Sequence, residues 1–310
     1  MGQKLRVLFV ASEGVPFAKT GGLADVVGTL PHALEEQGVE VKVLMPYYRM
    51  VREGKVTTTL IAEDLEVNLG LINHTFNLMA PTASDSPFYF IERDEFYDRR
   101  QLYGTPRGDY FDNLERFAFF SAAVLPFCRA LDFTPDVIHC HDWQTALVPV
   151  LLYELYEPLG MRHPRVCLTI HNFKHQGLAG DYVLRATGLN RPERFFAPDR
   201  LGSGSPGALN LMKGGIVYSN FVNTVSPTYA GEAKDRGGAF GLEPVLRAHH
   251  RKYGGILNGI DYAAWNPAAD RSIAAEYSPA NLAGKAACKA DLLAAFGLPA
   301  PKKDQPVMGM

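Results

Sequence analysis

A glycine-containing segment near the N-terminus has the residue types that bind a phosphate group. The segment 19–22, Lys-Thr-Gly-Gly, lies between an apolar run that predicts a strand and an amphipathic pattern that predicts a helix from Leu23. The first N–H groups of a helix have no partner within it and lie at the positive end of its dipole, so those near Gly21 and Gly22 can bind an anion. Lys19 would add a flexible positive charge. The residue order differs from a P-loop, and no Gly-x-Gly-x-x-Gly follows the first strand, which disfavours a kinase or a dehydrogenase.

Polar residues that could bind a ligand also follow three later apolar runs. Because the carboxyl ends of parallel strands meet at one edge of a sheet, we expect these residues to lie near the glycine segment. They are Asp142, His171, Asn172 and Asn258.

Three of the polar candidates also have an ordinary structural interpretation. Asp25, in the first turn of the predicted helix, would stabilise the helix dipole with or without a ligand contact. Asp142 could be the N-cap of a helix that begins at Trp143. Asn258 precedes a glycine, and Asn-Gly is a common turn. The pattern leaves the structural and the ligand-binding roles open for each residue.

The histidines suggest two metal sites, and the expected geometry disfavours both. The segment 139–141, His-Cys-His, alternates across a strand, so its side chains cannot converge on one zinc ion. His171 and His175 have the His-x-x-x-His spacing of a zinc metallohydrolase. Asn172 stands where the general-base glutamate would be, and the pair follows a strand rather than lying within a helix. We therefore expect no metal site.

The elements that position these residues alternate along the chain. Apolar runs rich in β-branched residues recur between helical patterns, which predicts an α/β fold with a Rossmann-like parallel sheet and helices on both faces. Residues 55–91 instead alternate between apolar and polar, which predicts a small antiparallel insertion, and residues 191–209 predict a surface loop. The predicted strands are 5–11, 39–45, 136–140, 166–170, 221–225 and 255–257, and the predicted helices are 23–37, 113–131, 143–156, 209–218 and 283–296.

Composition limits the possible partners. The chain has 310 residues, of which 47% are hydrophobic and 21% charged, with a formal net charge of −2. We therefore expect a globular protein that binds no nucleic acid. No run of about 18 apolar residues is present, so no membrane partner is expected. Four cysteines without paired spacing and the lack of a signal-peptide pattern favour a cytoplasmic location.

Several motifs, in this order along the chain, resemble those of the bacterial glycogen synthases and plant starch synthases. Each motif alone is weak, but their order makes the resemblance specific. They are the octapeptide 19–26 (Lys-Thr-Gly-Gly-Leu-Ala-Asp-Val), Leu102-Tyr103-Gly104, residues 109–113 with Arg116-Phe117, His141-Asp142-Trp143, residues 169–172, Lys213-Gly214-Gly215, residues 223–230, and residues 255–261 with Trp265-Asn266-Pro267.

The resemblance implies a fold and an activity. The chain would be the N-terminal half of a two-domain GT-B glycosyltransferase. The complete enzyme would transfer glucose from ADP-glucose to the non-reducing end of an α-1,4-glucan, glycogen or starch, with retention of configuration and without a metal or other cofactor. Residues 1–280 would form the acceptor and catalytic domain. Residues 281–310 would form a linker helix and the start of a truncated nucleotide-sugar domain, so the chain would be inactive alone.

The resemblance also implies roles for individual residues. His171 and Asp142 would be catalytic. The donor nucleotide sugar and its phosphates would contact Lys19, Gly21, Gly22, Asp25 and Asn258, and the acceptor or its sugars would contact Asn172 and Tyr103.

Two other functions remain compatible with the motifs. The segment 173–175, Phe-Lys-His, replaces aliphatic or small residues that are common in the family, and Gly231 replaces a larger one. One alternative is a non-catalytic α-glucan-binding module. The other is a related GT-B glycosyltransferase that uses UDP-glucose or a different acceptor.

Overall fold

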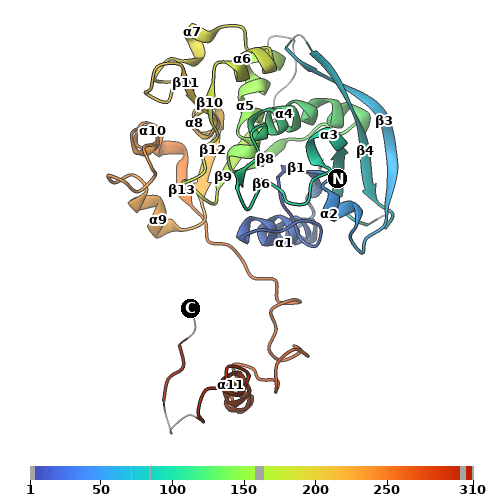
Figure 1. Cartoon of the computed structure of the whole chain (residues 1–310), viewed down its shortest axis with the longest axis vertical. Helices are drawn as coiled ribbons and strands as arrows, with labels where there is room; N and C mark the ends of the chain where they lie inside the picture. The colour runs from blue at the N-terminus through green and yellow to red at the C-terminus, as the bar shows by residue number, and fades with distance from the viewer. Residues whose placement is uncertain (1–3, 71, 84, 158–163, 301–304, 309–310) are drawn as a thin grey trace. The chain divides into compact units, whose positions relative to one another are not determined.

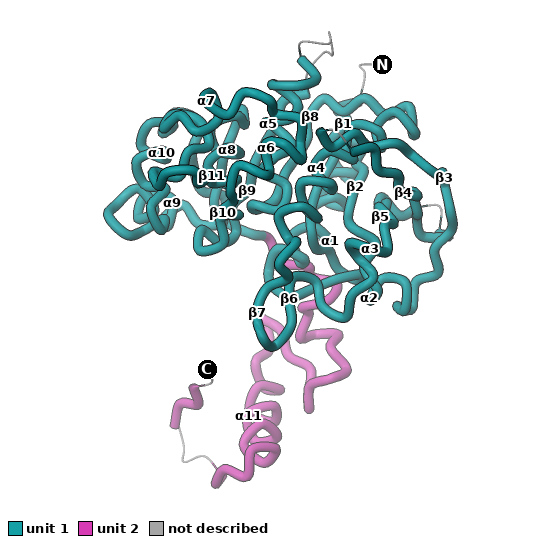
Figure 2. The backbone as a smooth tube through the Cα atoms, turned by 45° about the horizontal axis from the view of Figure 1, so that its top comes forward, with its two compact units in different colours: residues 1–258 teal, residues 259–310 magenta. Residues whose placement is uncertain are grey.

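The structure is a computed structural model that describes residues 4–70, 72–83, 85–157, 164–300 and 305–308. The chain divides into two compact units, Met1–Asn258 and Gly259–Met310, which Figure 2 shows in different colours. The predicted domain boundary after residue 280 stays a prediction. All predicted site residues belong to the first unit.

Nine strands of the described chain form one sheet, with β1 (Arg6–Val10) at its centre. Leu8, Phe9 and Val10 are fully buried, as expected of a strand whose two faces are both covered. The strands from β13 to β5 are all parallel, which confirms the predicted parallel sheet. The order is β13 (Tyr253–Gly255), β12 (Phe221–Thr224), β9 (Arg165–Ile170), β8 (Val137–His141), β1, β2 (Glu40–Pro46), β5 (Phe88–Glu92), β4 (Ile72–Pro81) and β3 (Thr58–Leu69).

The predicted antiparallel insertion is confirmed at one edge of this sheet. β4 pairs antiparallel with both β5 and β3. Along the end of β3, Val67 and Leu69 are buried while Glu66 and Asn68 are exposed. This alternation is typical of a strand with one face on the core and one in water.

The strand order reverses between β1 and β8. The helix α1 (Gly22–Glu36) leads from β1 to β2, whereas α5 (Leu147–Leu151) leads from β8 to β9 in the opposite direction. Because crossovers between parallel strands are right-handed, these helices cover opposite faces of the sheet, as seen in Figure 1. Doubly wound sheets bind ligands at the carboxyl ends of the strands where the order reverses.

The predicted helix 143–156 consists of three different helical segments. It begins with a 3-10 turn, η1 (Trp143–Thr145), continues as α5, and ends in a π-helical turn, η2 (Leu152–Tyr156). The neighbouring helix α4 (Asn113–Ala130) contacts α5 and β3, and it carries the buried Phe117, Phe119 and Phe120.

Two sequence predictions were wrong in detail. The last strand ends at Gly255, which pairs with the last residue of β12, Thr224. The N–H of Ile256 still donates to the carbonyl oxygen of Thr224 at 2.9 Å, but the side chains of Ile256 and Leu257 are exposed. The predicted loop 191–209 contains the short helix α7 (Pro192–Phe195), which begins with a proline at its first position.

Short elements complete the first unit. They are α2 (Arg49–Arg52), α3 (Asp94–Tyr97), β6 (Gly104–Thr105), β7 (Gly108–Asp109), β10 (Leu178–Gly180), α6 (Tyr182–Thr187), β11 (Ala208–Asn210), α8 (Leu211–Tyr218), α9 (Pro227–Glu232), α10 (Glu243–Ala248) and η4 (His250–Lys252).

The second unit contains turns and one helix, α11 (Gly284–Ala295), close to its predicted bounds. The Sγ of Cys288 donates to the carbonyl oxygen of Ala275 at 3.1 Å, and the ammonium of Lys285 lies 5.1 Å from the ring centroid of Tyr277. None of the helices in the described part of the chain has the length and hydropathy needed to cross a lipid bilayer.

Candidate active site

A polar cavity of about 460 Å³ opens at the carboxyl ends of the central strands. Its lining comes from the loops that follow β1, β8, β9, β12 and β13 and from the segment 103–113, which leads through β6 and β7 to α4. The polar strand ends therefore meet at one edge of the sheet, as expected. The predicted site residues that line it are Gly21, Gly22, Tyr103, Asp142, His171, Asn172 and Asn258.

The glycine segment is fixed by the carboxylate of Glu13, which is 4% exposed. The backbone N–H groups of Thr20 and Gly21 donate to Oε2, Gly21 at 3.2 Å. The hydroxyls of Thr20 and Tyr103 both donate to Oε1 at 2.6 Å. Because the Tyr103 hydrogen is used in this way, Ser12 is the donor in the 2.8 Å contact between their hydroxyls.

Because Glu13 binds this segment, the N–H groups available for a phosphate differ from those expected. The Gly21 N–H is occupied by Glu13, so the free groups are the first N–H groups of α1 itself, at Gly22 and Leu23. Tyr103 contributes its ring to the cavity, but its hydroxyl is already bonded.

Replacing Glu13 by glutamine should destabilise the fold. The amide keeps the size of the side chain but loses the charge and exchanges an acceptor oxygen for a donor. Hydrogen bonds to charged groups contribute roughly 1.5–3 kcal/mol each, so we expect E13Q to lower the free energy of unfolding by about 1–3 kcal/mol. Urea unfolding followed by circular dichroism measures this change.

The matched control is E36Q at the exposed end of α1, which should change stability by less than about 0.5 kcal/mol. Equal stability of E13Q and the parent chain would contradict the role of Glu13 as the anchor of the loop.

Lys19 and Asp25 form an ion pair beside the cavity. The Lys19 ammonium lies 2.6 Å from Oδ1 and 2.7 Å from Oδ2 of Asp25, and each side chain is nearly half exposed. Neither is among the described residues that line the cavity. Asp25 lies in the first turn of α1, as expected of a residue that stabilises the helix dipole.

Asp142 occupies the N-cap position of η1, as the structural interpretation predicts, but its side chain makes no capping hydrogen bond. Its backbone has φ +56° and ψ −173°, a conformation almost restricted to glycine that costs on the order of 1–3 kcal/mol. This backbone turns the carboxylate away from Trp143 and toward the end of β9. There Oδ1 accepts the backbone N–H of His171 at 2.7 Å and of Asn172 at 3.3 Å.

The carboxyl of Asp142 titrates near neutrality. Burial raises its pKa from 3.8 to about 7, and the nearby charge of Glu13 acts in the same direction. The two backbone hydrogen bonds from His171 and Asn172 oppose the increase in the pKa. Strain and an altered pKa at one residue in a cavity are typical of functional sites.

His171 lies beside Asp142 and is a neutral imidazole at pH 7, because burial lowers its pKa to about 4. Its Nε2 lies 3.1 Å from Nδ1 of His141, on the adjacent strand β8. Its Nδ1 has no hydrogen-bond partner among the described residues. His171 can therefore contact a ligand through this second nitrogen.

Two further residues of the cavity, Asn172 and Trp143, differ in how much of the side chain is available to a ligand. The Oδ1 of Asn172 accepts the backbone N–H of Lys174 at 2.9 Å, which leaves its amide group for a ligand. Trp143 lies in both the cavity and the core, where its ring makes an edge contact with Phe117 at a centroid distance of 5.3 Å.

The sequence did not single out two polar residues of the cavity. Glu13 lies two residues after the end of the first apolar run, just as Asp142 lies two residues after the end of the run 136–140, so the same signal could have found it. Gln144 also lines the cavity, and its Oε1 is buried without a partner among the described residues. It lies inside the predicted helix, where no sequence signal distinguishes it.

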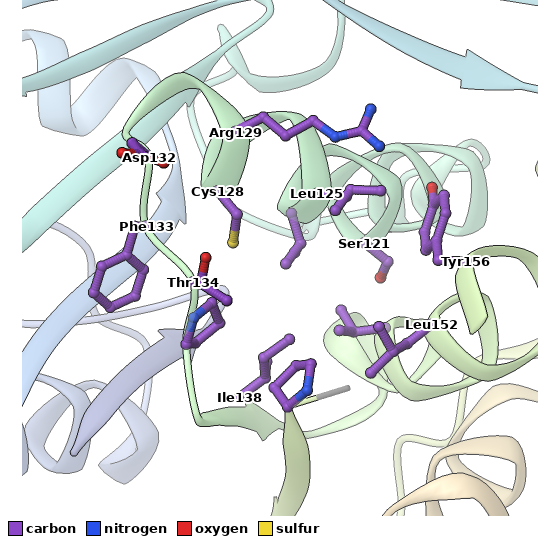
Figure 3. Close-up of a pocket in the computed structure, with 14 residues that line it drawn as sticks. Ser121, Leu125, Cys128, Arg129, Asp132, Phe133, Thr134, Ile138, Leu152 and Tyr156 are labelled. Atoms are coloured by element: carbon purple, nitrogen blue, oxygen red, sulfur yellow. The ribbon is translucent and has the colours of Figure 1, made fainter. Parts of the chain in front are cut away.

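A second cavity, shown in Figure 3, has a different character. It has a volume of about 170 Å³ and lies near the amino end of β8, next to Pro135 and Ile138. Apolar side chains dominate its lining. Burial raises the pKa of the lining Cys128 thiol to about 12, so this cysteine is not a reactive thiolate. The polar cavity is therefore the candidate active site.

Fold and site together define an α/β protein with a polar ligand cavity where the strand order reverses. The family model described as the starch synthase catalytic domain matches residues 6–248. The chain therefore belongs to the starch synthase catalytic domain family.

Sequence similarity to two bacterial glycogen synthases supports this assignment. Glycogen synthase 2 of Methylococcus capsulatus is 50% identical over 288 residues, which cover 91% of this chain and 58% of the relative. Glycogen synthase 2 of Geobacter sulfurreducens is 44% identical over 307 residues, which cover 99% and 62%.

A solved structure extends the comparison to the fold. The catalytic domain of starch synthase IV from Arabidopsis thaliana, bound to ADP and acarbose, superposes with a TM-score of 0.86 at 37% identity. The match covers 97% of this chain and 61% of that one, so the chain spans about three fifths of the length of these relatives. It confirms the predicted fold class, an α/β fold with a mostly parallel sheet that matches the catalytic domain of a GT-B glycosyltransferase.

Proposed function

We propose that this chain is the acceptor-side part of a glycogen or starch synthase. The complete enzyme transfers glucose from ADP-glucose to the non-reducing end of an α-1,4-glucan with retention of configuration. One observation carries the proposal: the start of α1 at Gly22 and the end of β9 at His171 line the same cavity. A phosphate seat and a sugar-binding pair therefore lie together.

The N-terminus of α1 would supply hydrogen-bond donors to a departing nucleotide. The N–H groups of Gly22 and Leu23 would donate to a diphosphate that gains negative charge as the glycosidic bond breaks. Lys19 can reach the same anion as a mobile cation once it leaves Asp25. Glu13 holds the loop so that these donors are already oriented before a ligand binds.

The ends of β8 and β9 support binding of the transferred sugar. His171 and Asn172 would bind its hydroxyls, and Asn258 would contact it from the loop after β13. Asp142 binds both backbone N–H groups of the His-Asn pair and so fixes their position. An oxocarbenium-like transition state benefits from oriented dipoles of this kind.

A neighbouring hollow of about 400 Å³ suits the acceptor. The two cavities are adjacent, because both are lined by Asp109, Asn113, Trp143 and His175. Its rim carries the aromatic rings of Phe111, which is 96% exposed, and Phe240, which is 58% exposed. Exposed rings can stack on the apolar faces of glucose units.

The comparisons support the substrates that we propose. Relatives named glycogen synthase match nearly the whole chain, and ADP and acarbose bind to the starch synthase IV relative. We propose that the reaction needs no metal or other cofactor, and that the protein is cytoplasmic.

Glucose transfer tests the proposal directly. The chain alone, incubated with labelled ADP-glucose and glycogen, should incorporate almost no label. A chimera in which the remaining C-terminal part of the Geobacter sulfurreducens relative follows this chain should incorporate label, because the relative is similar across 99% of the chain. Co-sedimentation with glycogen should detect weak glucan binding by the chain alone.

The controls separate the alternatives. Strong incorporation by the chain alone would contradict its role as one part of a larger catalytic unit. A folded chimera that binds glycogen without transfer would favour a binding module, and a preference for UDP-glucose in a donor competition would favour the related glycosyltransferase.

A further inference from the structure

Three histidine rings form a row that ends in the candidate active site. His139 and His141 lie on one face of β8, with their ring centroids 4.3 Å apart. The ring centroids of His141 and His171 are 5.4 Å apart. In both pairs the rings are stacked, with an angle of 30° between the ring planes. Among these three, only His171 lines the polar cavity. The other two rings do not line the cavity, and His141 is hydrogen-bonded to His171.

The proton position on His139 follows from its neighbours. Its Nε2 lies 2.7 Å from the hydroxyl of Thr169, and that hydroxyl donates to Oδ1 of Asn223 at 2.9 Å. A hydroxyl has one hydrogen, so Thr169 must accept from His139. His139 is thus neutral with its proton on Nε2, because burial lowers its pKa to about 4.

His141 and His171 can share their hydrogen bond in two ways. Either Nδ1–H of His141 donates to Nε2 of His171, or the direction is reversed. In the reversed arrangement, the neutral ring of His141 carries its proton on Nε2. That atom is buried and has no partner among the described residues.

A buried donor without an acceptor is costly and rare, more so than an unpaired acceptor. The ring stacking also denies this nitrogen an aromatic acceptor. Phe9 stacks on His141 at 20° and His139 at 30°, so an in-plane N–H of His141 does not point at either ring face. The geometry therefore favours donation by His141.

We propose that His141 is a positioning residue that donates its Nδ1–H to Nε2 of His171 and so fixes the proton of His171 on Nδ1. His171 then presents an N–H donor to the cavity rather than a basic lone pair. It binds an acceptor oxygen of the ligand, a sugar hydroxyl or a phosphate oxygen, and does not abstract a proton. The assignment of this ligand class rests on the proposed function, whereas the proton position does not.

Nitrogen-15 NMR of the chain labelled at histidine tests the proton position without any activity. Two-bond correlations distinguish a protonated ring nitrogen from a bare one, and the variants H141N and H171N assign the signals. At neutral pH we expect His171 and His141 each to show a protonated Nδ1 and a bare Nε2. A protonated Nε2 on His171, protonation of both of its nitrogens, or averaged signals would overturn the proposal.

Variants of His141 provide a second readout. Asparagine can place an amide donor near the position of Nδ1, so H141N should keep the Nδ1–H form of His171. H141L, of similar size and without a donor, should release His171 into a mixture of both forms. H175A, at an exposed histidine of the same cavity, should leave the signals of His171 unchanged. Identical His171 signals in H141L and the parent chain would contradict the role of His141.

Discussion

Acidification from about pH 7.5 to about pH 5 should lower the free energy of unfolding of this chain by about 2 kcal/mol or more. Burial lowers the pKa of His139 and of His171 to about 4, against 6.5 in an unfolded chain. Between these values the unfolded state binds more protons, so stability is lost as the pH falls. Taken alone, each of the two histidines would lower the free energy of unfolding by about 2 kcal/mol at pH 5. Burial also lowers the pKa of His141, which acts in the same direction.

Asp142 opposes this loss. Its pKa is about 7 in the fold and 3.8 as a free side chain, so the folded state keeps a proton that the unfolded state has lost. Stability from this residue therefore falls as the pH rises from about 4 to 7, and acidification to pH 5 restores about 2 kcal/mol.

The variant D142N separates the contribution of the histidines to the pH dependence of stability from that of Asp142. Without the titrating carboxyl, the loss between the same two pH values should increase to about 4 kcal/mol or more. Urea unfolding at each pH measures it, and E36Q should behave like the parent chain. An identical pH dependence of D142N and the parent would show that Asp142 is already ionised at pH 5.

Loss of the His171 side chain should abolish most of the glucose transfer by the chimera. Removing one oriented donor from an active site lowers kcat by about 10²–10³-fold, and we expect H171A to fall in this range. The KM for ADP-glucose should change much less, because in the proposed binding mode the diphosphate contacts the start of α1 and not His171. Initial rates at several donor concentrations separate the two parameters.

The control for this prediction is H32A, at an exposed histidine of α1 whose side chain lies 3.2 Å from the carboxylate of Glu35. It should transfer glucose at the rate of the parent chimera. If H171A retained more than about a tenth of the parent kcat, His171 would not be a residue that stabilises the transition state.

Much of the fold could be predicted because the central strands are buried on both faces. Such strands appear in the sequence as continuous apolar runs, and the polar residues that end them identify one edge of the sheet. This reasoning predicts that Asp142, His171 and Asn172 lie together, and all three line the same cavity. It was less accurate for β13. The end of this strand is set by its pairing with the short strand β12, and not by the apolar residues Ile256 and Leu257.

The partners within the site could not be predicted, because they join segments that are distant in sequence. Glu13 accepts the hydroxyl of Tyr103, 90 residues away, and Asp142 accepts the N–H of His171, 29 residues away. Local rules gave a helix cap for Asp142 and a free amide for Gly21. In both cases a carboxylate in a buried environment took the partners that tertiary structure offered, which no local pattern encodes.

The anchoring of the glycine loop by Glu13 has a thermodynamic consequence for ligand affinity. A loop that must become ordered on binding subtracts its lost conformational entropy from the interaction energy, whereas a rigid loop does not. Here the backbone of residues 20 and 21 is immobilised by an internal anion. If this chain binds a nucleotide as we propose, binding should therefore proceed with a small entropic penalty and little change in backbone order.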